Sequence, residues 1–126
     1  MRSPAWNRPN PTAALTYSGP MSPPVAIAYT VTATLPDAAT ADEYQGWLRD
    51  GHIQAVVAGG ALEACVSRLV DPRTTIEVEA RYLFPNRDVF DQYVAEVAPG
   101  LRAEGLARFG DRVRFSRRVA EVVATA

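Results

Sequence analysis

Residues 47–60 read WLRDGHIQAVVAGG, and the predicted elements of the chain are arranged around this stretch. It contains Trp47, the double glycine at residues 59–60, and His52, which is the only histidine. Glycine accepts backbone dihedrals that other residues avoid, so the pair is typical of a chain reversal after a helix. The stretch therefore predicts the end of one helix and a turn into a strand.

A strand precedes this helix. Residues 25–35, VAIAYTVTATL, alternate bulky with small or hydroxyl-bearing side chains, and a period of two is typical of a strand. Thr40 followed by Glu43 predicts a capping box, because a hydroxyl and a carboxylate satisfy the first unpaired amides of a helix. The helix is expected to end or kink at residues 50–51, Asp-Gly. Its predicted buried stripe, at three- and four-residue spacing, consists of Tyr44, Trp47 and Leu48.

Two strands follow the double glycine. Residues 61–70 form an apolar run, and residues 74–84 alternate apolar with mostly charged side chains. The Asp-Pro-Arg sequence at residues 71–73 is typical of a turn. The two strands are therefore predicted to pair as an antiparallel hairpin.

A second helix and a last strand complete the pattern. Asn86 is a good N-cap for the helix, and Pro99-Gly100 interrupts it. Proline is well tolerated in a first helical turn, so a short continuation is expected, and Gly110 closes it. Residues 111–123 form the last predicted strand, with Val113, Phe115 and Arg117 on one face.

The resulting order, β-α-β-β-α-β, predicts an α+β fold of the ferredoxin-like type with a four-stranded antiparallel sheet. Two helices cover only one face of such a sheet. A face-to-face homodimer that closes two sheets into a barrel is an economical way to cover the other face. Charged residues on strands 74–84 and 111–123 are predicted to make cross-strand ion pairs on the dimer seam or the solvated face, and the alternative is that they anchor a ligand.

The chain divides into two parts by composition. Residues 1–24 hold six of the ten prolines, which disfavour both helix and sheet, so we expect a flexible or extended N-terminal arm. Residues 25–126 are expected to form the ferredoxin-like domain, since 126 residues suffice for one domain with a sizeable core.

Composition excludes several classes of partner. A net charge of -1 argues against nucleic-acid binding, which requires a strongly cationic surface. No apolar run approaches the roughly 18 to 20 residues that span a bilayer, so no membrane insertion is expected. Cys65 is the only cysteine and is expected to be a small buried hydrophobe, with no disulfide to indicate an oxidising compartment. A cytoplasmic location is therefore expected.

Three segments of the chain carry a resemblance to a known family. YTVTATLPD, HIQAVVAGG and YLFPNRDVFDQYVAEVAPGLRAEGLARFGDRV resemble the DUF4286 proteins, a branch of the dimeric α+β barrel superfamily, over residues 29–123. Two positions depart from the family pattern: Gln54 replaces a usual proline, and Gly105 stands where a histidine is frequent. The resemblance implies a ferredoxin-like homodimer but no activity, and the wider superfamily includes cofactor-free monooxygenases, haem proteins, isomerases and binding domains. Fold alone does not choose among these.

His52 is the candidate acid–base residue, because the pKa of imidazole lies near neutrality. The alternative is that it caps the carbonyl end of the first helix. One histidine and one distant cysteine give no recognisable set of metal ligands, and His52 lies on an earlier helix than the haem ligands of the superfamily, so no metal, haem or other cofactor is expected.

The aromatic residues form either a pocket or a plain core. The candidate ligand-binding residues are Trp47, Tyr29, Tyr82, Tyr44 and Phe90, with Tyr93 beside them. The first hypothesis is a module that binds a small hydrophobic molecule or a protein partner. The alternative is a cofactor-independent enzyme, monooxygenase- or isomerase-like, that acts on a hydrophobic or aromatic substrate with His52 as acid–base. The two differ in whether His52 faces an enclosed cavity or solvent; a third hypothesis is an adaptor that binds through its proline-rich arm.

Overall fold

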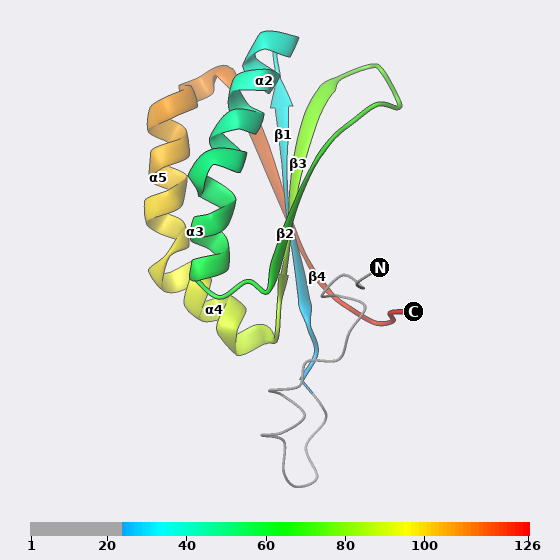
Figure 1. Ribbon diagram of the computed structural model, residues 1–126, viewed down its shortest axis with the longest axis vertical. Helices are drawn as coiled ribbons and strands as arrows, with labels where there is room; N and C mark the ends of the chain where they lie inside the picture. Colours follow the sequence, from blue (N-terminus) through cyan, green and yellow to red (C-terminus); the bar gives the residue numbers. More distant parts are fainter. Residues whose placement is uncertain (1–23) are drawn as a thin grey trace, which may run out of the picture.

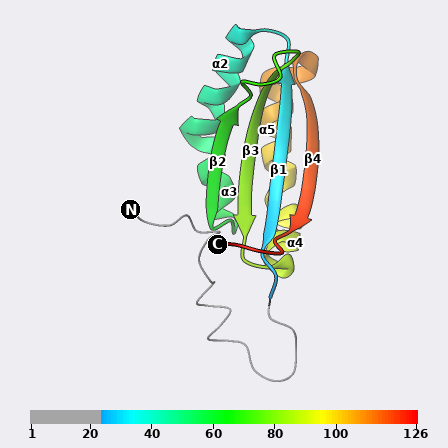
Figure 2. The same ribbon diagram turned by 90° about the vertical axis from the view of Figure 1, so that its right-hand side faces the viewer.

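A four-stranded antiparallel sheet in the order β2-β3-β1-β4 forms one layer of the structure, a computed structural model that describes residues 24–126. Figure 2 shows these strands side by side, with the helices behind them. Residues 1–23, nearly all of the predicted arm, lie outside the described residues. The strands are β1 (Ile27–Leu35), β2 (Glu63–Arg68), β3 (Ile76–Phe84) and β4 (Arg114–Glu121).

The helices form a second layer on one face of the sheet, as Figure 1 shows. They are α2 (Ala38–Trp47), η2 (Leu48–His52, a π-helical turn), α3 (Ile53–Ala58), α4 (Arg87–Glu96), α5 (Ala98–Phe109) and η3 (Gly110–Arg112, a 3-10 turn). This element order and strand order confirm the predicted ferredoxin-like α+β fold. The face of the sheet opposite the helices is called the outer face below.

The core lies between the two layers and follows the predicted alternation of β1. Ile27, Tyr29 and Ala33 are buried, at 1%, 3% and 0% exposure. In the register of β1 with β3, Tyr29 lies opposite Tyr82 and Ala33 opposite Val78, and both partners are also buried. Burial of this apolar face provides the main driving force for docking the helices.

The predicted capping box at the start of α2 is wrong. Asp37 is the N-cap, and its carboxylate accepts a hydrogen bond from the backbone N–H of Thr40 at 2.7 Å. Hydrogen bonds from Thr40 also hold the pKa of Asp37 below its usual value. Glu43 instead reaches across to α5 and η3, where it pairs with Arg108 at 3.3 Å and with Arg112 at 3.6 Å. An aspartate is as good an N-cap as a threonine, and it lies closer to the end of β1.

The kink predicted at residues 50–51 is confirmed. Gly51 has φ 152° and ψ -32°, a combination open to glycine, and the backbone N–H of Ile53 donates to the carbonyl of Leu48 five residues earlier. This π-type bond inserts an extra residue into the helical path. The helical path is therefore interrupted at Asp50 and Gly51, and it resumes at His52 before α3.

The glycine turn and the second helix also follow the prediction. Gly60 has φ 132°, and a Cβ on it would lie 2.8 Å from the Val89 side chain, so the turn requires glycine there. Asn86 caps α4 by accepting from the backbone N–H of Val89 at 2.9 Å. Pro99 lies in the first turn of α5, as expected.

Two expectations about individual side chains are wrong. The predicted cross-strand ion pairs fail because β1 separates β3 from β4, and Thr30 lies between Arg81 and Arg118 in the register. Glu79 instead pairs with Arg81 along β3, at 3.6 Å. Cys65 is exposed rather than buried, because β2 is an edge strand and its side chain alternates onto the outer face.

Candidate functional site

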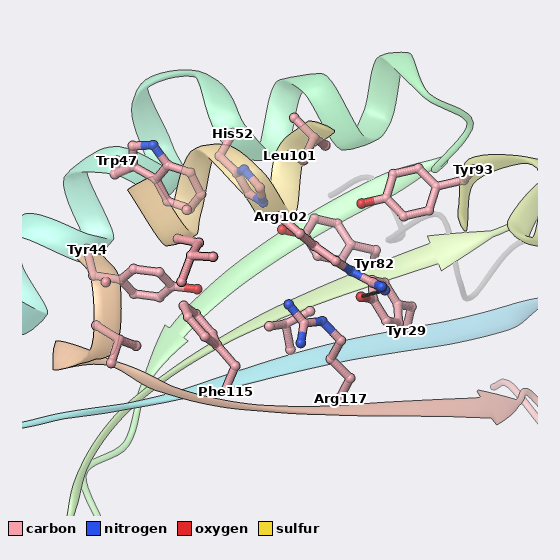
Figure 3. A pocket seen from close by; sticks show the side chains of 15 residues that line it. Tyr29, Tyr44, Trp47, His52, Tyr82, Tyr93, Leu101, Arg102, Phe115 and Arg117 are labelled. Carbon is pink, nitrogen blue, oxygen red and sulfur yellow. Dashed lines mark hydrogen bonds between the residues drawn. The ribbon is translucent and has the colours of Figure 1, made fainter. Parts of the chain in front are cut away.

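A cavity of about 340 Å³ lies between the helix layer and the sheet, and Figure 3 shows its lining side chains. Its lining residues come from strands β1, β3 and β4, from helices α2, α4 and α5, and from the two short turns η2 and η3. The wall consists of Tyr29, Val31, Tyr44, Trp47, His52, Tyr82, Tyr93, Leu101, Arg102, Gly105, Leu106, Gly110, Val113, Phe115 and Arg117.

One wall is a stack of rings built by the kink after α2. The Trp47 and His52 rings have centroids 4.1 Å apart and an interplanar angle of 28°. Tyr44 stacks on the other side of Trp47 at 5.9 Å. Residues three or four apart share a face of a regular α-helix, whereas Trp47 and His52 are five apart. The extra residue of the π-turn therefore accounts for their contact.

A glycine on α5 makes room for this stack. A Cβ at Gly105 would lie 3.3 Å from Cη2 of Trp47, tighter than an ordinary contact. Gly105 is buried and also belongs to the cavity wall. A larger side chain at this position would therefore enter the space that Trp47 and the cavity now occupy.

His52 faces this cavity in its neutral form. Burial lowers the pKa of His52 from 6.5 to about 4, so the ring is uncharged at neutral pH. Within residues 24–126, no group forms a hydrogen bond with its buried Nδ1 atom. The alternative of a helix cap finds no support, because no hydrogen bond joins the ring to a helix-end carbonyl in the described part of the chain.

Three tyrosines of the wall, Tyr44, Tyr82 and Tyr93, keep their protons. Burial raises the pKa of Tyr44 and of Tyr93 to about 12, and it also raises that of Tyr82. Tyr29 belongs to β1, and its hydroxyl accepts a hydrogen bond at 3.3 Å from a terminal nitrogen of Arg102 on α5. The wall therefore offers neutral hydroxyl groups among mainly apolar rings.

Two arginines join the wall from opposite layers. Arg102 projects from α5, and Arg117 projects from β4 with its guanidinium carbon 5.6 Å from the centre of the Phe115 ring. Figure 3 shows both side chains extending into the space between α5 and the sheet. Among the described residues, no cluster of three or more histidine, cysteine or acidic side chains could hold a metal ion.

Most of the predicted site residues meet in this cavity. The lining includes His52, Trp47, Tyr44, Tyr29 and Tyr82, and also Tyr93. Phe90 does not line it: this ring packs in the core against Phe84 at 5.1 Å and Tyr29 at 5.2 Å.

The sequence interpretation assigned no role in the site to either Arg102 or Arg117. For Arg117 a signal existed, since the alternation of the last strand places it on the same face as Phe115. For Arg102 the helical periodicity gave none, because a charged residue on a helix with a modest apolar face is usually solvated, although Arg102 belongs to a segment that carries the family resemblance.

Solved structures of similar fold come from several kinds of protein. A dimeric ferredoxin-like protein from an uncultured marine organism matches with a TM-score of 0.71 and 12% identity, over 81% of this chain and 99% of that one. A mutant of SnoaB, a cofactor-independent oxygenase from Streptomyces nogalater, matches with a TM-score of 0.59 and 14% identity, over 79% and 95%. An ethyl tert-butyl ether D (EthD) family protein from Bacillus halodurans matches with a TM-score of 0.60 and 10% identity, over 78% and 99%. At such low identity these matches show the fold alone.

No helix within residues 24–126 has the length and apolar character to cross a membrane.

Two further comparisons concern curated proteins and family models. The search of curated proteins found no match. A family model, Domain of unknown function (DUF4286), matches residues 26–123, and the chain therefore belongs to the DUF4286 family.

Proposed function

We propose that this chain forms a homodimer in which each subunit binds a small, mainly apolar aromatic molecule in the cavity beside His52. The cavity carries this proposal. Its volume of about 340 Å³ is at the lower end of the range of about 300 to 1,000 Å³ that is usual for ligand sites. Its wall is largely aromatic, with a few polar groups that could orient a ligand.

The ring stack favours a flat ligand. Because Trp47 and His52 stack on each other, they offer a ligand mainly their ring edges, and edge-to-face contacts between aromatic rings add to the gain from the area they bury. The tyrosine hydroxyls and the neutral imidazole add hydrogen-bonding groups without a strong local charge. A protein partner, the other part of the sequence hypothesis, could not enter a cavity of this size and would have to bind elsewhere.

The experiment is a titration of the protein with 2-naphthol, in which calorimetry measures the binding affinity. Gly105→Leu should fill the cavity and weaken binding at least about tenfold, since the new side chain displaces the ligand or Trp47. Gly100→Leu is the matched control: it lies on the same helix, and nothing lies within 4 Å of its Cβ position. Equal affinities in the wild type and Gly105→Leu would contradict binding in this cavity.

A second function, proton abstraction without a cofactor, has one specific observation in its favour. His52 lines the cavity and is neutral, because burial lowers its pKa to about 4, and a neutral imidazole beside a ligand suits a base that accepts a substrate proton. The proton of an activated C–H group would move to His52, and the electron pair would remain on the substrate as an enolate. A pKa near 4 makes the imidazole a weak base in the empty cavity, so we rank binding above catalysis.

Deuterium incorporation into 2-tetralone, a bicyclic ketone with acidic C–H groups, tests the second function. Catalysis by His52 predicts faster incorporation with the wild type than with His52→Gln, at comparable affinity for the ketone. Equal rates in both proteins would leave binding as the only function of the site.

The homodimer is proposed on the outer face of the sheet, in agreement with the dimeric description of the first structural relative. Thr32 lies near the middle of this face on β1. Thr32→Arg should convert the dimer to a monomer in sedimentation velocity, whereas Gln92→Arg, on the exposed side of α4, should not. A monomeric wild type would overturn this proposal.

The cytoplasmic location expected from the sequence stays a prediction.

A further inference from the structure

The charges on the cavity wall are unbalanced. Its lining includes two guanidinium groups and no carboxylate, although the chain as a whole has 14 acidic and 13 basic residues. Within residues 24–126, neither Arg102 nor Arg117 forms an ion pair. Other arginines do pair, as Arg108 and Arg112 do with Glu43.

Both cations act on the same part of the cavity. Burial raises the pKa of Tyr93, and the positive charges of Arg102 and Arg117 both oppose that rise. The two arginines belong to different layers, one on α5 and one on β4, and Figure 3 shows both between the layers. A ligand in the cavity would therefore meet positive charge from the helix side and from the sheet side.

The remaining contacts of these arginines leave donors for a ligand. Arg102 uses one terminal nitrogen on the Tyr29 hydroxyl, and that hydroxyl keeps its own proton to donate. Arg117 packs on the Phe115 ring, which restrains a side chain that would otherwise be mobile. A guanidinium group has five N–H donors in a planar fork that matches a carboxylate.

We propose that the ligand of this cavity is an aromatic acid, with its rings against the Trp47–His52 stack and its carboxylate between Arg102 and Arg117. This inference rests on the proposed binding function and adds the chemical class of the ligand. Both arginines are exposed although they line the cavity, so we place the carboxylate toward solvent at the mouth of the cavity and the rings inside it.

The test compares 2-naphthoate with 2-naphthamide, which share their ring system and differ in charge. Calorimetry near neutral pH should give the wild type at least about tenfold higher affinity for the naphthoate, the usual order for a charge-assisted hydrogen-bonded pair. Arg117→Gln and Arg102→Gln should each remove most of that preference, because they weaken binding of the naphthoate much more than binding of the amide. Arg118→Gln is the matched control, since Arg118 is the next residue of β4 and lies on the outer face, with Thr30 as its register partner.

The outcomes separate this inference from the function on which it rests. Equal affinities for both probes, unchanged by Arg117→Gln and Arg102→Gln, would overturn the aromatic acid and leave the cavity as a neutral ligand site. Binding of neither probe by the wild type would contradict the binding function and this inference together. The amide affinity also reports whether each variant keeps an intact cavity, so a folding defect cannot imitate the expected result.

Discussion

Protonation of His52 should destabilise the fold at mildly acidic pH. In the unfolded chain the pKa of His52 is close to 6.5, whereas burial lowers it to about 4 in the fold. The unfolded state therefore takes up a proton first as the pH falls. Stability from the neutral ring is complete above about pH 6.5, decreases between about pH 6.5 and 4, and changes no further below that range.

The size of this effect follows from the shift in pKa. At 1.36 kcal/mol per pKa unit, a change from 6.5 to about 4 corresponds to about 3.4 kcal/mol. The ring is only partly buried, and solvent screening reduces this figure. We therefore expect the free energy of unfolding to decrease by about 2 kcal/mol between pH 7 and pH 4.5 because of His52 alone.

The assay is urea unfolding followed by far-ultraviolet circular dichroism at a series of pH values. The control is His52→Phe, which keeps a ring on Trp47 and has no proton to gain. Both proteins contain Asp37 and Glu43, whose lowered pKa values also remove stability as the pH falls below about 4, so their effect cancels in the difference. Protein concentration is held constant, because dimer formation would make stability depend on it.

The wild-type curve should fall more steeply than that of His52→Phe, and the two should diverge between about pH 6.5 and 4. Parallel curves over this range would show that the imidazole is as well solvated in the fold as in the unfolded chain. That result would refute the placement of His52 in the cavity wall and with it the reasoning about the site.

Further predictions concern the scaffold that holds the cavity. Asp37→Ala should lower the free energy of unfolding through loss of the N-cap, and by more than Thr40→Val, which keeps the backbone N–H that donates to Asp37; the reverse order in urea unfolding would restore the capping box. Gly60→Ala should lower the free energy of unfolding by at least about 2 kcal/mol, since φ is 132° and the new Cβ would lie 2.8 Å from the Val89 side chain. The control Gly100→Ala, with open space at its Cβ, should leave stability unchanged, and similar thermal midpoints for the two variants would contradict this prediction. Glu43→Gln should cost only a small part of the stability, and the difference from wild type should shrink as salt is added, because its pairs are exposed; a salt-independent loss would argue against ion pairing.

The fold could be predicted to a large extent from the sequence, because its signals are local. Residues 25–35 alternate with a period of two wherever they are placed, and the bulky face of the resulting strand is the one that packs in the core of the subunit. The turn signal at residues 59–60 and the N-cap at Asn86 are also local, because each affects only backbone within a few residues of itself. The order of the elements then restricted the topology to very few arrangements. The N-cap of α2 was missed because two suitable residues, Asp37 and Thr40, compete within one turn, and the choice depends on where β1 ends.

The site was only partly predictable, because it depends on contacts between residues far apart in the chain. The sequence by itself determined which residues are aromatic, which is the lone histidine and which faces are apolar. Only the tertiary structure decided that a π-turn brings His52 onto Trp47, and that Gly105 leaves space beside them. It also placed β4 beside β1 and under α5, which brings Arg102 and Arg117 to one cavity without an acidic partner. Periodicity shows the face on which a side chain lies, whereas the packing of sheet and helices decides which side chains meet there.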